Sequence, residues 1–302
     1  MKIIVTGANG FVGKNLSVFL LNKGYEVTSL SLRKEDWRGG FQKSADVIMH
    51  LAGKAHDTKN VSNPDEYYKI NRDLTKELFN EFLNSEIKTF FYFSSVKAAA
   101  DSVDGILTEN EKTNPVTHYG KSKIEAEEYI LSQNLPKEKK VFIIRPCMIH
   151  GPGNKGNLNL LYKIVEKGLP WPLAAFHNQR SFLGIDNLNY LIYKMLLKEN
   201  LPSGIYNFAD DKALSTNELI QTVNASLDKK AKLWNISKHL IGKIARLGDK
   251  LKLPLNSERL KKLTESYIVS NQKIKSALGI EKLPLSAEEG LIKTIKSFKE
   301  KK

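Results

Sequence analysis

Cysteine is almost absent from the 302-residue chain, and so are long apolar runs. The single cysteine, Cys147, can form no internal disulfide, which fits a reducing compartment, and its place at the end of an apolar run predicts a small buried side chain. No apolar run approaches the roughly 18 residues that a membrane-spanning helix needs. The N-terminus enters an apolar run at once, without the pattern of a secretory signal. We therefore expect a cytoplasmic globular protein.

Internal repeats, low-complexity segments and flexible linkers are also missing, whereas positive charge is in excess. The net charge is +14, and residues 229–302 hold 19 Lys and Arg against 7 Asp and Glu, a difference of +12. In residues 238–253, KHLIGKIARLGDKLKL, cations alternate with leucines and isoleucines at helical spacing, which favours a solvated helix face over a packed apolar face. Weak peripheral contact with a membrane through these basic helices is the alternative. Nucleic acid is not an expected partner, because no basic groove rich in aromatic residues is present.

Short apolar strands and amphipathic helices alternate along the first half of the chain. Strands are expected at KIIVT, YEVTSLSL, DVIMHLAG, TFFYFSSV and KVFIIRPCMI, with helices between them, including one over residues 64–84 and one over HYGKSKIEAEEYILSQ. This order predicts an α/β fold, a Rossmann-like doubly wound parallel sheet with a smaller C-terminal α/β lobe. We expect the first domain to comprise residues 1–150 plus about 178–205, and the second lobe residues 151–177 plus about 206–302.

Three glycines lie in the turn between the first expected strand and the first expected helix, in TGANGFVG. Gly7 permits a tight turn, Gly10 lets the backbone approach a pyrophosphate, and Gly13 lets the helix pack close to the sheet. The helix N-terminus near Phe11 offers N–H groups and a positive dipole end to an anion. The strand before the glycines and the helix after them therefore indicate a dinucleotide site.

The end of the second strand indicates which dinucleotide is bound, because an acidic side chain there accepts hydrogen bonds from the adenosine ribose. Ser31 occupies that position and Arg33 follows it, an arrangement that favours the 2′-phosphate of NADP. Asp36 comes a few residues later, where a loop could place it differently and favour NAD. The expected cofactor is therefore NAD or NADP, with a slight preference for NADP.

A tyrosine and a lysine lie one helical turn apart in YGKSK, so Tyr119 and Lys123 project from the same helix face. Tyrosine has a reference pKa near 10 and is a poor base at neutral pH, but an adjacent ammonium and an oxidised nicotinamide both favour the phenolate. Tyr119 is therefore a candidate proton carrier. Ser95, at the end of the preceding strand, could hydrogen-bond the same substrate oxygen.

With these motifs in this order, the chain resembles the extended short-chain dehydrogenase/reductases, and within them the NAD-dependent epimerase/dehydratase family that acts on nucleotide sugars. The resemblance covers almost the full length and rests on TGANGFVG, DVIMHLAG, YYKINRDLTKEL, FYFSSVKAAA, YGKSK, RPCMIHGPG, RSFLGIDNL and LGIEKLPLSAEEGL. It implies an NAD(P)-binding domain, a substrate lobe, and hydride and proton exchange at a sugar carbon, C4 of a UDP-sugar, in surface-polysaccharide biosynthesis. It also implies a homodimer formed through the helices that carry Asn71 and Tyr119.

Carried over residue by residue, the resemblance implies three sets of site residues. The catalytic residues would be Ser95, Tyr119 and Lys123, with Lys123 also binding the nicotinamide ribose. The cofactor would contact Gly7, Asn9, Gly10, Phe11, Val12, Gly13, Ser31, Arg33, Leu51, Ala52, Gly53, Ser94, Tyr119, Lys123, Pro146 and Met148. The substrate would contact Ser95, Asn154, Asn157 and Arg180, the last through a phosphate. A salt bridge from Arg180 to an acid such as Asp186 is the alternative. No metal site is expected.

The residues after the catalytic serine narrow the reaction. Dehydratases of this family place an Asp-Glu pair there, but Ser95 is followed by Val96 and Lys97, which disfavours a 4,6-dehydratase. A 4-epimerase would keep its NAD and show no net redox change, whereas a 4-ketoreductase would consume NADPH, and both remain open. A non-catalytic NADP-binding redox sensor or scaffold is the third interpretation, less favoured because Tyr119 and Lys123 are both present.

Overall fold

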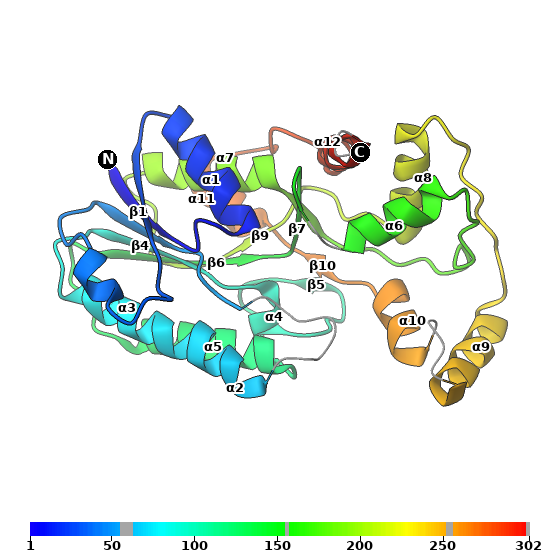
Figure 1. Ribbon diagram of the computed structural model, residues 1–302, viewed down its shortest axis with the longest axis horizontal. Coiled ribbons are helices and arrows are strands. Elements are labelled where there is room, and N and C mark those ends of the chain that lie inside the picture. Colours follow the sequence, from blue (N-terminus) through cyan, green and yellow to red (C-terminus); the bar gives the residue numbers. More distant parts are fainter. Residues whose placement is uncertain (55–62, 155–156, 252–255, 300–302) are drawn as a thin grey trace.

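A six-stranded parallel sheet forms the centre of the computed structural model, which describes residues 1–54, 63–154, 157–251 and 256–299 (Figure 1). The strand order is β2-β1-β3-β4-β6-β9, and every neighbouring pair is parallel. The strands are β1 (Lys2–Thr6), β2 (Glu26–Leu30), β3 (Val47–His50), β4 (Thr89–Phe93), β6 (Lys140–Pro146) and β9 (Gly204–Phe208). The predicted α/β fold with a doubly wound parallel sheet is confirmed.

The direction in which the sheet grows reverses at β1. Val5 of this strand lies opposite Ser29 of β2 on one side and opposite Met49 of β3 on the other. In open α/β sheets a crevice forms at the carboxyl ends of the strands beside such a reversal, and ligands bind there. The glycine turn that follows β1 is therefore at the point where this topology favours a nucleotide.

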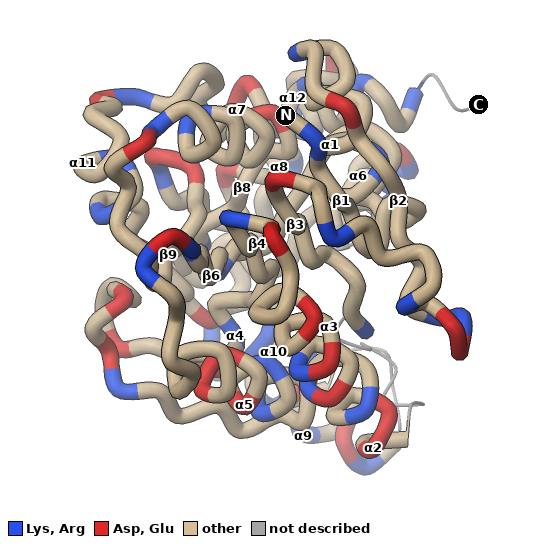
Figure 2. Tube along the Cα trace, turned by 90° about the vertical axis from the view of Figure 1, so that its left-hand side faces the viewer, with Lys and Arg blue, Asp and Glu red and all other residues tan. Residues whose placement is uncertain are grey.

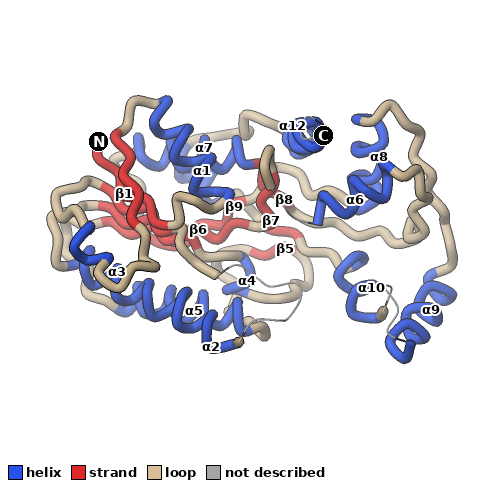
Figure 3. The backbone as a smooth tube through the Cα atoms, in the orientation of Figure 1, coloured by secondary structure: helices blue, strands red, loops and turns tan. Residues whose placement is uncertain are grey.

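Helices cover both faces of the sheet (Figure 3). Ile3 and Val5 pack with α1 and α7 on one face, whereas Ile4, between them, packs with α3 and α5 on the other. Successive strand residues point to opposite faces, so a sheet covered on both sides needs strands that are apolar throughout. These four helices are α1 (Phe11–Asn22), α3 (Leu74–Leu83), α5 (His118–Ser132) and α7 (Ile185–Leu197).

The helix predicted over residues 64–84 contains a wider turn. It consists of α2 (Pro64–Tyr67), a π-helical segment (Tyr68–Asp73) and α3. Asn71 is fully buried within the π-helical segment, where its Oδ1 accepts a hydrogen bond from the Lys54 N–H at 2.7 Å and its Nδ2 donates to the Ser122 hydroxyl at 3.1 Å. Such turns recur at functional sites. This one ties the segment after β3 to helix α5.

A smaller lobe is built around a separate apolar cluster that includes Trp171, Leu219 and Leu291. Its elements include the pair β7 (Met148–His150) and β8 (Phe182–Gly184), with α6 (Asn157–Glu166), α8 (Thr216–Ser226), α9 (Lys238–Leu251), α10 (Ser257–Thr264) and α12 (Ala287–Lys299). Helices α9 and α10 lie at the end of the molecule farthest from the large sheet (Figure 1). The chain returns to the large sheet at β9, so the division predicted near residue 205 falls within that strand.

The C-terminal part of the chain also contacts the first domain directly. Strand β10 (Ile268–Val269) pairs with β5 (Ile106–Leu107), and α11 (Gln272–Leu278) packs against β9. The Tyr267 hydroxyl, at the start of this segment, donates to the carbonyl oxygens of Val96 at 3.1 Å and Ala100 at 2.7 Å. These residues begin and follow the short helix α4 (Val96–Ala99). The last fifth of the chain therefore fixes α4, which comes directly after Ser95.

Cys147 is a buried free thiol between β6 and β7, as predicted. Its N–H donates to the Phe208 carbonyl at 3.0 Å, and burial raises the pKa of the thiol well above its usual value. Within the described ranges, no helix is both long enough and apolar enough to cross a membrane.

Candidate active site

The glycine turn after β1 is closely packed, which explains two of its three glycines. Gly7 has a φ of +68°, and a Cβ atom there would lie 2.7 Å from the Ala52 nitrogen. A Cβ atom at Gly13 would lie 2.3 Å from the Gly7 carbonyl oxygen. Any larger residue at either position forces the loop to move, because real Cβ atoms do not approach so closely.

The third glycine, Gly10, is the N-cap of α1 and provides no side-chain acceptor. The first turn of α1, at Phe11 and Val12, therefore presents its N–H groups without a capping side chain, and the preceding residue, Asn9, is exposed. A helix N-terminus of this kind binds anions. The turn fits the pyrophosphate of a dinucleotide, as the sequence predicts.

A chain of four hydrogen bonds holds the segment after β3 against the glycine turn. The Ala52 N–H donates to Thr6 Oγ1 at 3.1 Å, the Thr6 hydroxyl is 2.7 Å from His50 Nδ1, and His50 Nε2 is 2.8 Å from Thr75 Oγ1. The Thr75 hydroxyl donates to the Asn71 carbonyl oxygen, so it accepts from His50, and the imidazole carries its proton on Nε2. Burial lowers the pKa of His50 to about 3, which keeps the ring neutral. The predicted cofactor residues Leu51, Ala52 and Gly53 thus follow a rigid strand end.

Ser95 and Tyr119 form the centre of the candidate site. Ser95 is the N-cap of α4, where its Oγ accepts a hydrogen bond from the Lys97 N–H at 3.2 Å, and its side chain is hydrogen-bonded to Tyr119. Burial raises the pKa of Tyr119 above its usual value, and the hydrogen bond to Ser95 opposes that shift. Desolvation therefore outweighs this hydrogen bond, and the favouring of the phenolate by Lys123 and the nicotinamide stays a prediction.

Lys123 lies one helical turn after Tyr119 and is buried. Its Nζ donates to the Phe93 carbonyl oxygen at 2.9 Å and lies 4.9 Å from the centre of the Tyr92 ring. Burial lowers the pKa of Lys123 to about 8, and the charge of Glu127 acts in the opposite direction. A Cβ atom at Gly53 would lie 3.2 Å from Lys123 Nζ, so the ammonium faces the segment after β3. This position fits the predicted contact with a cofactor ribose.

A buried ion pair behind the site was not predicted from the sequence. Arg145 Nε lies 3.0 Å from both carboxylate oxygens of Glu127, and the Ser94 hydroxyl donates to the same carboxylate. The signal was present, since Arg145 interrupts the apolar run FIIRP and Glu127 follows Lys123 by one helical turn. The Ser94 hydroxyl is thus engaged within the protein, and the contact of this residue with a cofactor stays a prediction.

The residues that bear on cofactor choice lie just beyond β2. Ser31 and Arg33 are exposed. Asp36 is the N-cap of the short 3-10 helix η1 (Trp37–Gly40), where its Oδ1 accepts from the Gly39 N–H at 3.3 Å. Asp36 is therefore used to start this helix, which weakens the interpretation that it replaces the missing ribose acid.

The segments after β6 lie at the same carboxyl edge of the sheet. Pro146, the last residue of β6, pairs with Phe208, and Met148 begins β7 opposite Phe182. Asn154 donates from Nδ2 to the Ile149 carbonyl oxygen at 2.8 Å, which fixes the turn before α6. Asn157 is the first residue of α6, and its side chain lies outside the described part of the structure.

Arg180 is largely withdrawn from solvent and points toward the C-terminal end of α10. Its Nη1 donates to the Lys262 carbonyl oxygen at 2.6 Å, and burial lowers its pKa. Asp186 instead pairs with Lys293 at 2.7 Å, so Asp186 is not the acid that pairs with Arg180; the charge of another acid, Glu265, opposes the effect of burial on Arg180. Burial lowers the pKa of Lys97, and the charge of Arg180 acts in the same direction, which places the guanidinium near the residues that follow Ser95.

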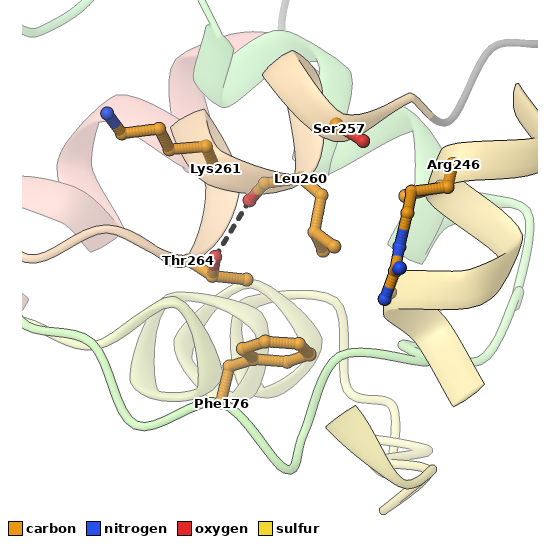
Figure 4. A pocket seen from close by; sticks show the side chains of 8 residues that line it. Phe176, Arg246, Ser257, Leu260, Lys261 and Thr264 are labelled. Carbon is orange, nitrogen blue, oxygen red and sulfur yellow. Dashed lines mark hydrogen bonds between the residues drawn. The ribbon is translucent and has the colours of Figure 1, made fainter. Parts of the chain in front are cut away.

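An open pocket of about 420 Å³ lies between α9 and α10 in the smaller lobe (Figure 4). Phe176 projects into it from the loop before Arg180 and Arg246 from α9, whereas Lys261 of α10 belongs to its wall but directs its ammonium away from it. The remaining lining residues are Gly242, Ala245, Ser257, Leu260 and Thr264. No residue of this pocket was predicted as a site residue from the sequence, because Phe176 is far in the chain from the two consecutive helices that form the other walls.

Comparison with known proteins identifies the family. Residues 3–209 match the NAD dependent epimerase/dehydratase family, and the chain belongs to it. UDP-glucose 4-epimerase of Vibrio cholerae is 28% identical, over 98% of this chain and 95% of its own. N-acetyl-alpha-D-glucosaminyl-diphospho-ditrans,octacis-undecaprenol 4-epimerase of Escherichia coli O157:H7 is 29% identical, over 76% of this chain and 73% of its own. The solved structure of UDP-N-acetylglucosamine 4-epimerase from Bacillus cereus has a TM-score of 0.78 at 20% identity, over all of both chains.

The predicted family, the predicted enzyme class and the predicted nicotinamide dinucleotide cofactor are thereby confirmed. The expected activity, a nucleotide-sugar epimerase or reductase, agrees with the activities named for these relatives.

Proposed function

We propose that the protein is a UDP-sugar 4-epimerase that keeps NAD bound through its catalytic cycle. The observation that carries this proposal is the hydrogen bond between Ser95 and Tyr119, next to Lys123 and beside the glycine turn. The 4-epimerase activities named for the Vibrio cholerae and Escherichia coli relatives support it. We further propose a cytoplasmic homodimer that contributes to surface-polysaccharide biosynthesis.

The residues around the glycine turn fit the cofactor. The first turn of α1 would hold the pyrophosphate, Lys123 the nicotinamide ribose, and the segment Leu51–Gly53 would pack beside the dinucleotide. NAD supplies hydride exchange when bound. The remaining contacts proposed with it are those of Ser31, Arg33, Ser94, Pro146 and Met148.

The chain itself would move one proton. Tyr119, as the phenolate, takes the proton of the sugar hydroxyl and becomes a neutral phenol, and it gives the proton back to that oxygen as the carbon takes its new configuration. Ser95 holds the same sugar oxygen by a hydrogen bond, and the buried Lys123 ammonium favours the phenolate form of Tyr119 that this step needs. Asn154, Asn157 and Arg180 would bind the nucleotide part of the substrate, with Arg180 at a phosphate.

A 4-ketoreductase that uses NADPH is the second candidate. The observation that favours it is the exposed Arg33 beyond β2, together with the engagement of Asp36 in capping η1. A guanidinium in place of an acid suits a 2′-phosphate.

The identity of the released nucleotide distinguishes the two candidates. The purified protein is denatured and the supernatant analysed by mass. The native protein is assayed without added cofactor on UDP-glucose, UDP-N-acetylglucosamine and the lipid-linked sugar of the Escherichia coli relative, and with NADPH on a UDP-4-keto sugar. An epimerase releases NAD and converts a substrate without added cofactor. A reductase releases none and oxidises added NADPH only when given a 4-keto sugar. If neither of these results is obtained in any assay, both candidates are contradicted.

Tyr119→Phe tests the proposed proton carrier. This variant should lose turnover by a factor of roughly 100 or more while retaining cofactor binding, because only the phenolic oxygen is removed. Tyr190→Phe, on helix α7, is the matched control and should keep wild-type turnover. Full activity in Tyr119→Phe would remove Tyr119 from this role.

A further inference from the structure

Helix α9 has an apolar face that is wider than the surface it packs against. Ile241, Ala245 and Gly248 are buried against the smaller lobe. The adjoining apolar positions are exposed, at 51% for Leu240, 41% for Ile244, 52% for Leu247 and 60% for Leu251. Their spacing of four, three and four residues places them in one stripe along the helix. Part of the apolar face of α9 is therefore open to the surroundings, whereas the sequence favoured an apolar face packed against the protein.

A row of cations runs beside this stripe. Lys243, Arg246 and Lys250 repeat at intervals of three and four residues and occupy the next sector of the helix surface. The opposite end of the molecule differs, because Lys and Arg there are interspersed with Asp and Glu along α3 and α5 (Figure 2). The Asp249 carboxylate is hydrogen-bonded by Ser257, from both its N–H at 2.9 Å and its hydroxyl.

The acid on α10 is also engaged. Glu258 pairs with Lys262 at 2.5 Å. Both carboxylates in the described stretches 238–251 and 256–264 therefore have other partners. Within these stretches, neither forms an ion pair with the cationic row of α9.

We propose that α9 docks the protein on an anionic phospholipid bilayer, with the exposed leucines and Ile244 among the acyl chains and the cationic row against the headgroups. A helix with a wide apolar face and a basic border lies in the plane of such an interface. Each cation near an anionic surface adds attraction that salt screens. A second copy of the same face is a poor alternative, because its own cationic row would repel this one.

The position of α9 is compatible with catalysis on the membrane surface. The helix lies at the end of the molecule far from the large sheet, whereas the glycine turn is at the carboxyl edge of that sheet (Figure 1). Docking through α9 therefore leaves the glycine turn uncovered. The docking proposal is independent of which sugar the enzyme converts.

Vesicle flotation tests the docking. The full-length protein is mixed with vesicles of phosphatidylcholine alone or of an equal mixture of phosphatidylcholine and phosphatidylglycerol, at low and high ionic strength. We expect it to float with the mixed vesicles at low ionic strength, less at high ionic strength, and not with phosphatidylcholine alone. Absence of binding to the mixed vesicles at low ionic strength would overturn the proposal.

Paired substitutions assign the binding to α9. Leu240→Gln with Leu247→Gln should lower the partition coefficient by about tenfold or more, because two side chains lose their apolar contact with lipid. Leu160→Gln with Leu197→Gln, at comparably exposed positions on α6 and α7, is the matched control and should bind as the wild type does. An equal loss in both double variants would mean that α9 is not the docking surface.

Reversing the charge of the cationic row provides an independent test of the docking proposal. The double variant Lys243→Glu with Lys250→Glu should weaken vesicle binding at low ionic strength by about tenfold or more. The control is Lys112→Glu with Lys137→Glu, which makes the same charge change on exposed loop residues elsewhere. It should weaken binding less. Equal weakening would show a nonspecific effect of net charge and contradict docking through α9. Both α9 variants should keep wild-type turnover of a water-soluble substrate.

Discussion

The buried imidazole at the end of β3 makes the stability of the protein depend on acid pH. His50 is fully buried, and its two ring nitrogens are hydrogen-bonded to Thr6 and Thr75. Protonation of Nδ1 would remove the acceptor that the Thr6 hydroxyl uses and place a charge in an apolar interior. The folded state therefore excludes a proton that the unfolded chain accepts.

The size of the effect follows from the two pKa values. The pKa of His50 is about 3 in the fold, against 6.5 for the free side chain. Above pH 6.5 the ring is neutral in both states and contributes no pH dependence. Below that value the unfolded chain binds the extra proton, so the free energy of unfolding falls by about 1.4 kcal/mol per pH unit until the pH nears the folded value. Between pH 6.5 and pH 5 the loss from His50 is about 2 kcal/mol.

Urea unfolding at pH 7 and at pH 5, followed by circular dichroism, measures this loss. Other groups titrate as well, so the informative quantity is the difference between wild type and His50→Gln. The variant should be less stable at pH 7 but should lose about 2 kcal/mol less on acidification. His118→Gln, in which an exposed histidine is replaced, is the control and should follow the wild type. Equal pH dependence in wild type and His50→Gln would refute the reasoning.

Three further substitutions test the site. Gly13→Ala places a Cβ atom 2.3 Å from the Gly7 carbonyl oxygen, so the affinity for NAD measured by calorimetry should fall about tenfold or more, and unchanged affinity would contradict the packing argument. Glu127→Gln leaves its guanidinium partner buried and uncompensated, so the free energy of unfolding measured in urea should fall by about 3–5 kcal/mol. Because the charge of Glu127 raises the pKa of Lys123, against the effect of burial, the same variant should lose NAD affinity at a lower pH than the wild type does. An unchanged pH dependence of NAD affinity would count against this coupling. Arg33→Ser should weaken NADPH binding about tenfold and leave NADH binding unchanged, whereas equal loss for both would remove Arg33 from the selection of the 2′-phosphate.

The fold could be predicted because its signals are local. Strands of a sheet that is buried on both faces are apolar along their whole length, and in KIIVT and TFFYFSSV that pattern needs no information from distant residues. The glycine turn could be predicted for the same reason, since its strand, turn and helix are contiguous. The proximity of Ser95 and Tyr119 followed from their place after a strand and at the start of a helix.

The polar network behind the site could not be predicted in the same way. His50 and Arg145 each lie within an apolar run, and the sequence shows that they are unusual but not which partner satisfies them. Thr75, Glu127 and the π-helical segment at Asn71 supply those partners from helices on the face of the sheet. Likewise, the periodicity of α9 predicts an apolar face but not how much of it the rest of the protein covers.

Tyr267 donates hydrogen bonds to the residues around α4, and β10 pairs with β5. These contacts join the C-terminal segment to the first domain, so we expect the two lobes to fold together. A fragment that stops near residue 150 would lack β9 and leave the apolar strand β6 as an open sheet edge, which invites self-association. It would also lose the support of the segment after Ser95. Gene fusion or truncation at the apparent domain boundary would therefore yield an aggregating product rather than a minimal nucleotide-binding module.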